Sequence, residues 1–290
     1  MRPVPFLIVP VHRNGEAVIT AKVFEKRIRT AFVPTADPEA PATSSSDANL
    51  GLQLDHRVAA IRRIVSGRVV FTTSFGIEDQ AIAHSIFSQG LAVDVVTLDT
   101  GRLFPETFDL WAQTEQRYGR HILAVYPDRD SVEALVTRQG INGFYASVEA
   151  RHSCCAVRKV EPLRRALAGA VAWITALRAD QSDERVGASF AIVAPRHRLI
   201  KVNPLFDWSR EQVVAFVREH DIPYHTLHDR GFASIDCAPC TRAVAPGEPE
   251  RAGRWWWEQE QTIERELLDR HVARAPASQP SPSSPQEATP

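Results

Sequence analysis

The sequence predicts an α/β fold in which a parallel β-sheet is covered by helices on both faces. The composition is the first indication, because 44% of the 290 residues are hydrophobic and 24% are charged, which is typical of a globular chain and excludes a disordered or fibrous one. Strand-like and helix-like patterns then alternate from residue 50 to residue 219, as they do in parallel sheets. Finally, polar segments directly follow the strands, where parallel sheets bind ligands.

Each element of this fold is predicted from local pattern. β-Branched and aromatic runs predict strands, whereas apolar residues at helical spacing predict helices. Pro105 suits the first turn of a helix that runs to about Tyr118. In chain order we expect a helix at 52–65, a strand at 69–73, a helix at 79–88, a strand at 93–98, a helix at 105–118, a strand at 122–126, helices at 131–137 and 157–167, strands at 172–176 and 190–193, and a helix at 210–219.

Composition divides the chain into four segments. Residues 1–33 hold two apolar runs around Asn14-Gly15, a strong hairpin signal, and predict a small β appendage. The Pro-, Ala- and Ser-rich residues 34–49 predict a disordered linker before the main domain at 50–258. Residues 259–290 form a C-terminal tail that is too poor in large apolar residues, from about 273 onward, to order itself.

Charge and hydropathy exclude several classes of function. The formal net charge of −1 shows no excess that would indicate nucleic-acid binding, and no apolar run approaches the roughly 20 residues of a membrane helix. The start of the chain does not have the pattern of a signal peptide, so we expect a cytoplasmic protein whose thiols stay reduced. The cysteines are therefore of interest as ligands rather than as disulfides.

Two polar turns are candidate sites for an anion. The segment TSFGIED at 73–79 joins a strand to a helix, and its N–H groups at the helix N-terminus can hold a phosphate-like group. A simple turn capped by Ser74 and Asp79 is an equal alternative. The second turn, LDTGRLFPET at 98–107, adds a glycine for a tight turn and the fixed cation Arg102.

The four cysteines form two tight pairs, at 154–155 and at 237–240. Four thiolates match a [4Fe–4S] cluster or a structural zinc site, although zinc prefers two to four residues within each pair. Redox-active disulfides and buried, inert thiols are the alternatives. Cations near both pairs fit a ligand that bears sulfate or phosphate. The tryptophans at 255–257 fit packing or, alternatively, stacking on adenine.

Together these motifs resemble those of the assimilatory adenylyl-sulfate reductases, within the phosphoadenylyl-sulfate reductase family. The resemblance covers nearly all of residues 50–258 in the family's order, so the set is far more specific than any single loop. The matching segments are SFGIED at 74–79, LDTGRLFPET at 98–107, CCxxRKxxPL at 154–163, LRADQS at 177–182, CAPC at 237–240 and RAGRWWWE at 251–258.

The resemblance implies an adenine-nucleotide α-hydrolase-like fold and the reduction of adenylyl sulfate to sulfite and AMP in sulfate assimilation, with thioredoxin as the reductant. It also implies a [4Fe–4S] cluster on Cys154, Cys155, Cys237 and Cys240. Members that act on the 3′-phosphorylated substrate usually lack these cysteines, so adenylyl sulfate is favoured. The implied substrate contacts are Ser74, Phe75, Gly76, Glu78, Asp79, Asp99, Thr100, Gly101, Arg102, Lys159, Arg178, Gln181, Arg185, Arg251 and Arg254.

The tail departs from the family pattern. In the family, the tail carries the motif E-C-G-L-H. The cysteine thiolate of this motif attacks the substrate sulfur and carries a thiosulfonate. In the best register Arg265 stands at the position of that cysteine and Glu266 at the glycine, and the sequence contains no fifth cysteine. Ala176 is a lesser departure, because glycine is usual there. We therefore expect an intact binding site without its catalytic thiol.

Other functions fit parts of the sequence. A reductase of the 3′-phosphorylated substrate is one alternative, and a homologue that binds cluster and nucleotide without turnover is another, supported by the missing thiol. An ATP pyrophosphatase of the same fold would carry Ser-Gly-Gly-x-Asp-Ser in the first turn, where Phe75 replaces a glycine here. A zinc ion in place of the cluster is the remaining alternative.

Overall fold

A computed structural model describes residues 46–181, 189–194 and 199–258. The predicted β appendage at 1–33 and the tail from residue 259 lie outside the described residues. The elements are α2 Ser46–Ile64, β1 Arg68–Thr73, α3 Ile77–Ser88, β2 Asp94–Leu98, α4 Pro105–Tyr118, β3 Leu123–Val125, α5 Arg129–Gln139, α6 Val148–Cys155, α7 Glu161–Ala166, β4 Ala170–Ile174, β5 Ala191–Ala194, β6 Leu199–Val202 and α8 Arg210–Glu219.

The described strands form a six-stranded sheet in the order β3-β2-β1-β4-β6-β5. All neighbouring pairs are parallel except β5 and β6. The prediction of a parallel sheet is thus confirmed, with one antiparallel edge strand. The short connection explains this edge, because only residues 195–198 separate β5 from β6 and a parallel crossover needs a dozen or more.

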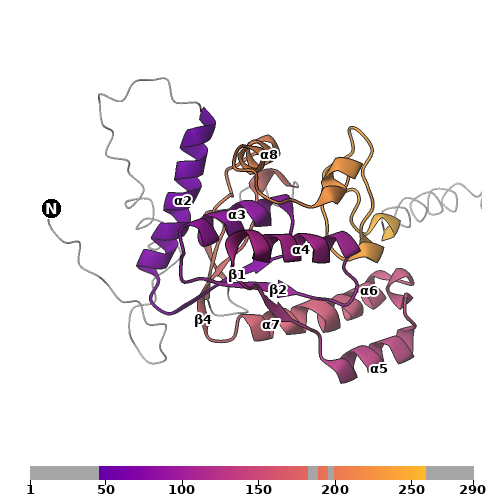
Figure 1. The fold of residues 1–290 in the computed structure, drawn as a ribbon. Coiled ribbons are helices and arrows are strands. Elements are labelled where there is room, and N and C mark those ends of the chain that lie inside the picture. The colour runs from indigo at the N-terminus through magenta and orange to yellow at the C-terminus, as the bar shows by residue number, and fades with distance from the viewer. Residues whose placement is uncertain (1–45, 182–188, 195–198, 259–290) are drawn as a thin grey trace, which may run out of the picture.

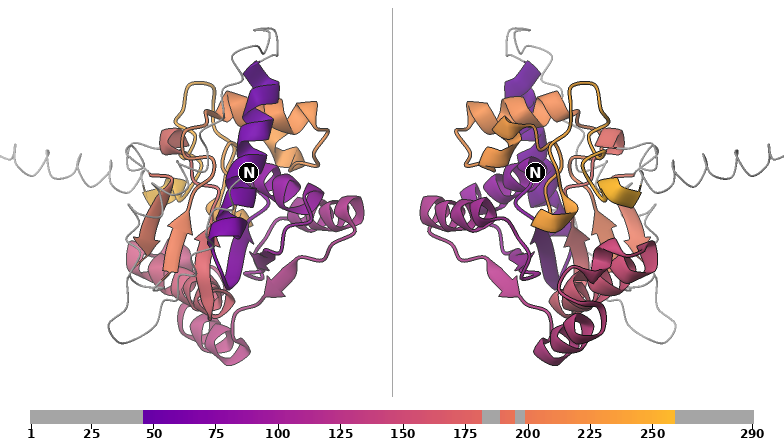
Figure 2. Two further views of the ribbon diagram at one scale, coloured as in Figure 1. Left: turned by 90° about the vertical axis from the view of Figure 1, so that its left-hand side faces the viewer. Right: turned by 90° about the vertical axis from the view of Figure 1, so that its right-hand side faces the viewer.

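Helices cover both faces of the sheet (Figures 1 and 2). Strand β1 shows how the sequence builds the two cores, because successive side chains point to opposite faces. Val69 and Phe71 are buried in the larger core with residues of α2, α3 and α8. Val70, between them, packs in a smaller core with Ala166 of α7 and Leu199 of β6. A strand buried on both faces reads as the continuous apolar run seen here.

The order of the strands fixes the place of the site. The chain runs from β1 outward to β2 and β3, then returns to place β4 on the other side of β1. This reversal leaves a crevice beyond the carboxyl ends of β1 and β4, which is where open α/β sheets bind ligands. Within the described residues no helix is long and apolar enough to cross a membrane.

Several observed elements differ from the predicted ones, and the helix predicted at 157–167 is a π-helical segment at Ala156–Val160 followed by α7. Helix α2 begins at Ser46, inside the predicted linker, and serine and aspartate are residue types favoured at helix starts. Strand β4 ends at Ile174, two residues early. Strand β6 and helix α6 were not predicted, because β6 spans only four residues and α6 spans eight, too few to show a period.

Candidate active site

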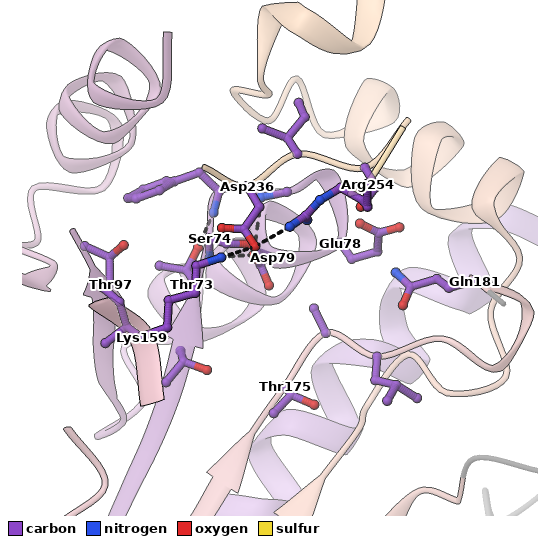
Figure 3. Close-up of a pocket in the computed structure, with 18 of the residues that line it drawn as sticks. Thr73, Ser74, Glu78, Asp79, Thr97, Lys159, Thr175, Gln181, Asp236 and Arg254 are labelled. Atoms are coloured by element: carbon purple, nitrogen blue, oxygen red, sulfur yellow. Dashed lines mark hydrogen bonds and ion pairs between the residues drawn. The ribbon is translucent and has the colours of Figure 1, made fainter. Parts of the chain in front are cut away.

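A cavity of about 410 Å³ opens at the carboxyl edge of the sheet, at the reversal between β1 and β4 (Figure 3). Its walls come from the segments that follow β1, β2 and β4 and from the chain around residues 233–236 and 250–255. The two polar turns predicted from sequence meet here, because both Ser74 and Thr100 line the cavity. Lining residues named in the prediction are Ser74, Phe75, Gly76, Glu78, Asp79, Thr100, Lys159, Gln181, Arg251 and Arg254.

The turn after β1 is held by its own side chains. Ser74 donates to Asp79 Oδ2 from its N–H at 2.7 Å and from its hydroxyl at 2.8 Å, and the N–H of Gly76 donates to the same oxygen at 3.3 Å. Phe75 has φ of 62°, a conformation that favours glycine, and its buried ring stacks on Trp111. Burial raises the pKa of Asp79 to about 6. Asp79 thus caps the turn, and an anion bound there would compete with its carboxylate.

The turn after β2 divides its residues between the cavity and the surface. The Thr100 hydroxyl lies 3.2 Å from Cys237 Sγ and is buried. Arg102 points elsewhere, because its guanidinium donates to Ile141 O at 2.7 Å and to Asn142 Oδ1 at 2.8 Å. Arg102 therefore fastens the 141–142 segment rather than the cavity wall.

Three charged side chains meet at one wall of the cavity. Asp236 Oδ2 accepts from Lys159 Nζ and, at 2.7 Å, from Arg254 Nη2 (Figure 3). Its other oxygen accepts from the backbone N–H of Cys237 at 2.8 Å. Burial alone would raise the pKa of Asp236, but Lys159 and Arg254 hold it well below its ordinary value. We call Lys159, Asp236 and Arg254 the charged triad.

The cysteine segments converge next to the triad. Cys237 and Cys240 pack in one apolar cluster with Phe144 and Trp257, and Cys154, near the end of α6, packs against it. Cys155 lies close enough to Arg151 to contribute to the raised pKa of that guanidinium. All four thiols are free. Burial raises the pKa of Cys240 to about 12, and it also raises the pKa values of the Cys154 and Cys237 thiols.

Comparisons with known proteins match this arrangement. The phosphoadenosine phosphosulfate reductase domain family matches residues 68–243, which span the whole sheet and both cysteine pairs. The chain belongs to this reductase family. An adenosine 5′-phosphosulfate reductase of Agrobacterium fabrum is 51% identical over 84% of this chain and 93% of its own, and one of Allochromatium vinosum is 48% identical over 73% and 84%. The resemblance inferred from the motifs is confirmed.

A solved structure extends the comparison to the fold of the family. Phosphoadenylyl-sulfate reductase from Candida auris, in a phosphate complex, superposes with a TM-score of 0.56 at 25% identity and covers 71% of this chain and all of that one. The predicted fold class is thus confirmed for this member of the reductase family.

The expected substrate contacts of a reductase of this family are not all at the cavity wall. Arg178 is fully buried behind it, where Glu78, Asp180 and Glu250 enclose the guanidinium. This cation therefore holds α3, the turn after β4 and the 250 segment together. Asp99, Gly101 and Arg102 also lie outside the lining, and Arg185 lies outside the described residues.

Several polar residues of the cavity wall were missed by sequence reasoning, among them Asp236, Lys201, His228 and Glu250. Asp236 was not predicted because an aspartate beside a Cys-x-x-Cys carries no signal of its own, and only the fold brings Lys159 and Arg254 to it. All three tryptophans pack with the cysteine cluster, as the packing interpretation predicts. Trp255 also lines the cavity, where Arg254 lies over its ring.

Proposed function

We propose that this chain binds adenylyl sulfate in the cavity and that its reaction is the reduction of adenylyl sulfate to sulfite and AMP. The observation that carries the proposal is the place of Lys159 and Arg254, two cations at the wall of a nucleotide-sized cavity at the switch point of the sheet. The relatives from Agrobacterium fabrum and Allochromatium vinosum, named adenosine 5′-phosphosulfate reductases, support the choice of substrate.

The reaction needs two electrons, which we propose come from the dithiol of thioredoxin. Since the proposed cluster takes all four cysteines of the chain, one thiolate of that dithiol attacks the sulfur, the bond from sulfur to the phosphate oxygen breaks, and AMP leaves with that oxygen. A second thiol then releases sulfite and leaves a disulfide, so that two electrons pass from sulfur atoms of the reductant to the sulfate group. Lys159 and Arg254 would stabilise the negative charge on the departing phosphate.

The cysteines fit a [4Fe–4S] cluster. The donor set is four free thiols from two segments that the fold brings together, and three of them share one apolar cluster. Within the described ranges no group of three or more His, Cys, Asp or Glu side chains is arranged to hold a single metal ion. We propose that Cys154, Cys155, Cys237 and Cys240 hold the cluster, which when bound would tie both segments together as thiolates.

A second function is favoured by one observation in the sequence. All four cysteines are committed to the proposed cluster, so none of them supplies a nucleophile while it is a ligand. Arg265, at the position of the family nucleophile, lies outside the described residues. The second candidate is therefore a protein that binds cluster and adenylyl sulfate without turning it over.

One assay separates the two candidates. The full chain is purified anaerobically and incubated with adenylyl sulfate, reduced thioredoxin and thioredoxin reductase, and both sulfite and AMP are measured. The first candidate predicts equal amounts of sulfite and AMP over many turnovers, whereas the second predicts binding by calorimetry without either product.

Two additions to this assay test the substrate and the thiol. The 3′-phosphorylated substrate, run in parallel, tests the choice of adenylyl sulfate. The double variant Arg265→Cys, Glu266→Gly tests whether the missing thiol alone limits turnover, with Arg265→Ala, Glu266→Gly as the matched control. Iron and sulfide analysis with an absorption spectrum tests the cluster independently of activity.

A further inference from the structure

The charged triad contains an anion that the chain itself provides. Asp236 Oδ2 accepts hydrogen bonds from Lys159 and Arg254 at once, and these are the two cations that a sulfonated nucleotide would need. All three side chains line the cavity, and in Figure 3 the carboxylate lies between the two cationic groups. Without Asp236 the pair of cations carries a formal charge of +2, and with it the triad carries +1.

The carboxylate is accessible enough to meet a ligand. The side chains of Lys159 and Asp236 are each 24% exposed, and that of Arg254 is 5% exposed. Arg254 is additionally fixed by its Nε, which donates to Cys240 O at 3.3 Å, and by packing on the Trp255 ring. Of the two cations, Lys159 is thus the one that is free to exchange Asp236 for a ligand oxygen, because its flexible stem carries a single ammonium group.

We propose that Asp236 is a built-in counter-ion of the anion site, which occupies the position that anionic oxygens of the ligand take and so determines how tightly the site binds them. This deepens, and rests on, the proposed binding of adenylyl sulfate. Asp236 keeps the two partly buried cations paired when no ligand is bound, since unpaired buried charges are costly. The same pairing lowers the affinity for the ligand, because the ligand must replace Asp236 on at least one cation.

Calorimetry on variants of the full, anaerobically purified chain tests this inference. The probes are AMP, which carries the anion, and adenosine, which does not. Asp236→Asn and Asp236→Gly remove a negative charge that lies a few ångströms from the bound dianion. We therefore expect both variants to bind AMP at least tenfold more tightly than the wild type does. Their affinity for adenosine should stay within about twofold of the wild-type value. Asp236→Glu retains the charge, so any gain in its AMP affinity should be smaller than the gain in Asp236→Asn.

A matched control removes a carboxylate from an ion pair outside the cavity. Asp207 pairs with Arg57 through two hydrogen bonds, and Asp207→Asn should leave both affinities unchanged. If the folded Asp236→Asn and Asp236→Gly variants bind AMP no more tightly than the wild type, Asp236 is a scaffold for the cations and the inference is overturned.

A crystal structure of the wild-type chain with AMP keeps the inference testable if the variants do not fold. The phosphate oxygens should then contact Lys159 or Arg254, with Asp236 withdrawn from that cation. A complex in which both cations remain on Asp236 overturns the inference. Failure of the proposed function gives a different result. If neither the wild type nor any variant binds AMP, the proposed function and the inference about Asp236 are both overturned. If Asp236→Asn binds AMP more tightly but the wild type produces no sulfite, only the reductase activity is overturned.

Discussion

The buried guanidinium of Arg178 gives the sharpest prediction about stability. It is completely inaccessible, and it donates to Glu78 Oε1 at 2.9 Å, to Glu250 Oε2 at 2.7 Å and to Asp180. The carboxylate side chains of Glu78 and Glu250 are only 10% and 15% exposed. Arg178→Met keeps the apolar stem but leaves Glu78 buried without its cation, and leaves Glu250 with only Arg210, at 3.4 Å. Removing one partner of a buried ion pair costs about 3–5 kcal/mol.

Urea unfolding followed by circular dichroism measures this loss. We expect the Arg178→Met loss to be smaller at pH 5 than at pH 8, because burial already raises the pKa of Glu250 and the carboxyl can take up a proton at the lower pH. The triple variant with Glu78→Gln and Glu250→Gln should recover part of the stability. Arg129→Met, at an exposed position on α5, is the control and should change the free energy of unfolding by less than about 0.5 kcal/mol. A loss below about 1 kcal/mol for Arg178→Met would refute the reasoning.

Further predictions concern pH and local packing. Burial lowers the pKa of His225 to about 4, so the unfolded state takes up a proton before the folded state does. The free energy of unfolding should therefore fall by about 3 kcal/mol as pH falls from 6.5 to 4. Urea titrations should show that His225→Gln lacks this loss. The pH dependence due to Asp79 has the opposite sign, because its folded pKa of about 6 exceeds the unfolded value of 3.8. The free energy of unfolding should rise by up to about 3 kcal/mol as pH falls through this range. Asp79→Asn should abolish that rise. In Gly253→Ala the new Cβ would lie 2.3 Å from the Arg242 carbonyl oxygen. The free energy of unfolding should therefore fall by about 1–3 kcal/mol, which a lower melting temperature would show. Arg102→Ala should speed amide exchange around residues 141–144 while AMP affinity changes less than about threefold, and a larger loss of affinity would contradict the geometry.

Much of the fold follows from local pattern because its central strands are buried on both faces. The strand at 69–73 and the helices at 105–118 and 210–219 were predicted within one residue of their ends. Pro105 explains one of these boundaries, and Ser209 explains another, since its side chain accepts from the N–H of Gln212. Strand β6 could not be predicted, because its pairing with β4 and β5 is set by the tertiary fold.

The site was predictable as a set of residue types and not as a set of contacts. Sequence motifs identified Lys159 and Arg254, which the fold brings to the cavity wall. They also identified Arg178, whose motif does not reveal that three carboxylates enclose it. Burial and pairing depend on residues 70 or more positions away in the chain, such as Glu250 for Arg178 and Asp236 for Lys159. Local pattern carries no information about such partners.

The central claim is that this cavity binds adenylyl sulfate through the cations at its wall. Calorimetric titration of the anaerobically purified chain with adenylyl sulfate, compared between the wild type and Lys159→Met, tests it most directly. We predict one site per chain and at least a tenfold loss of affinity in Lys159→Met, with Arg129→Met unchanged. Equal affinity in the wild type and in a folded Lys159→Met variant would contradict the claim.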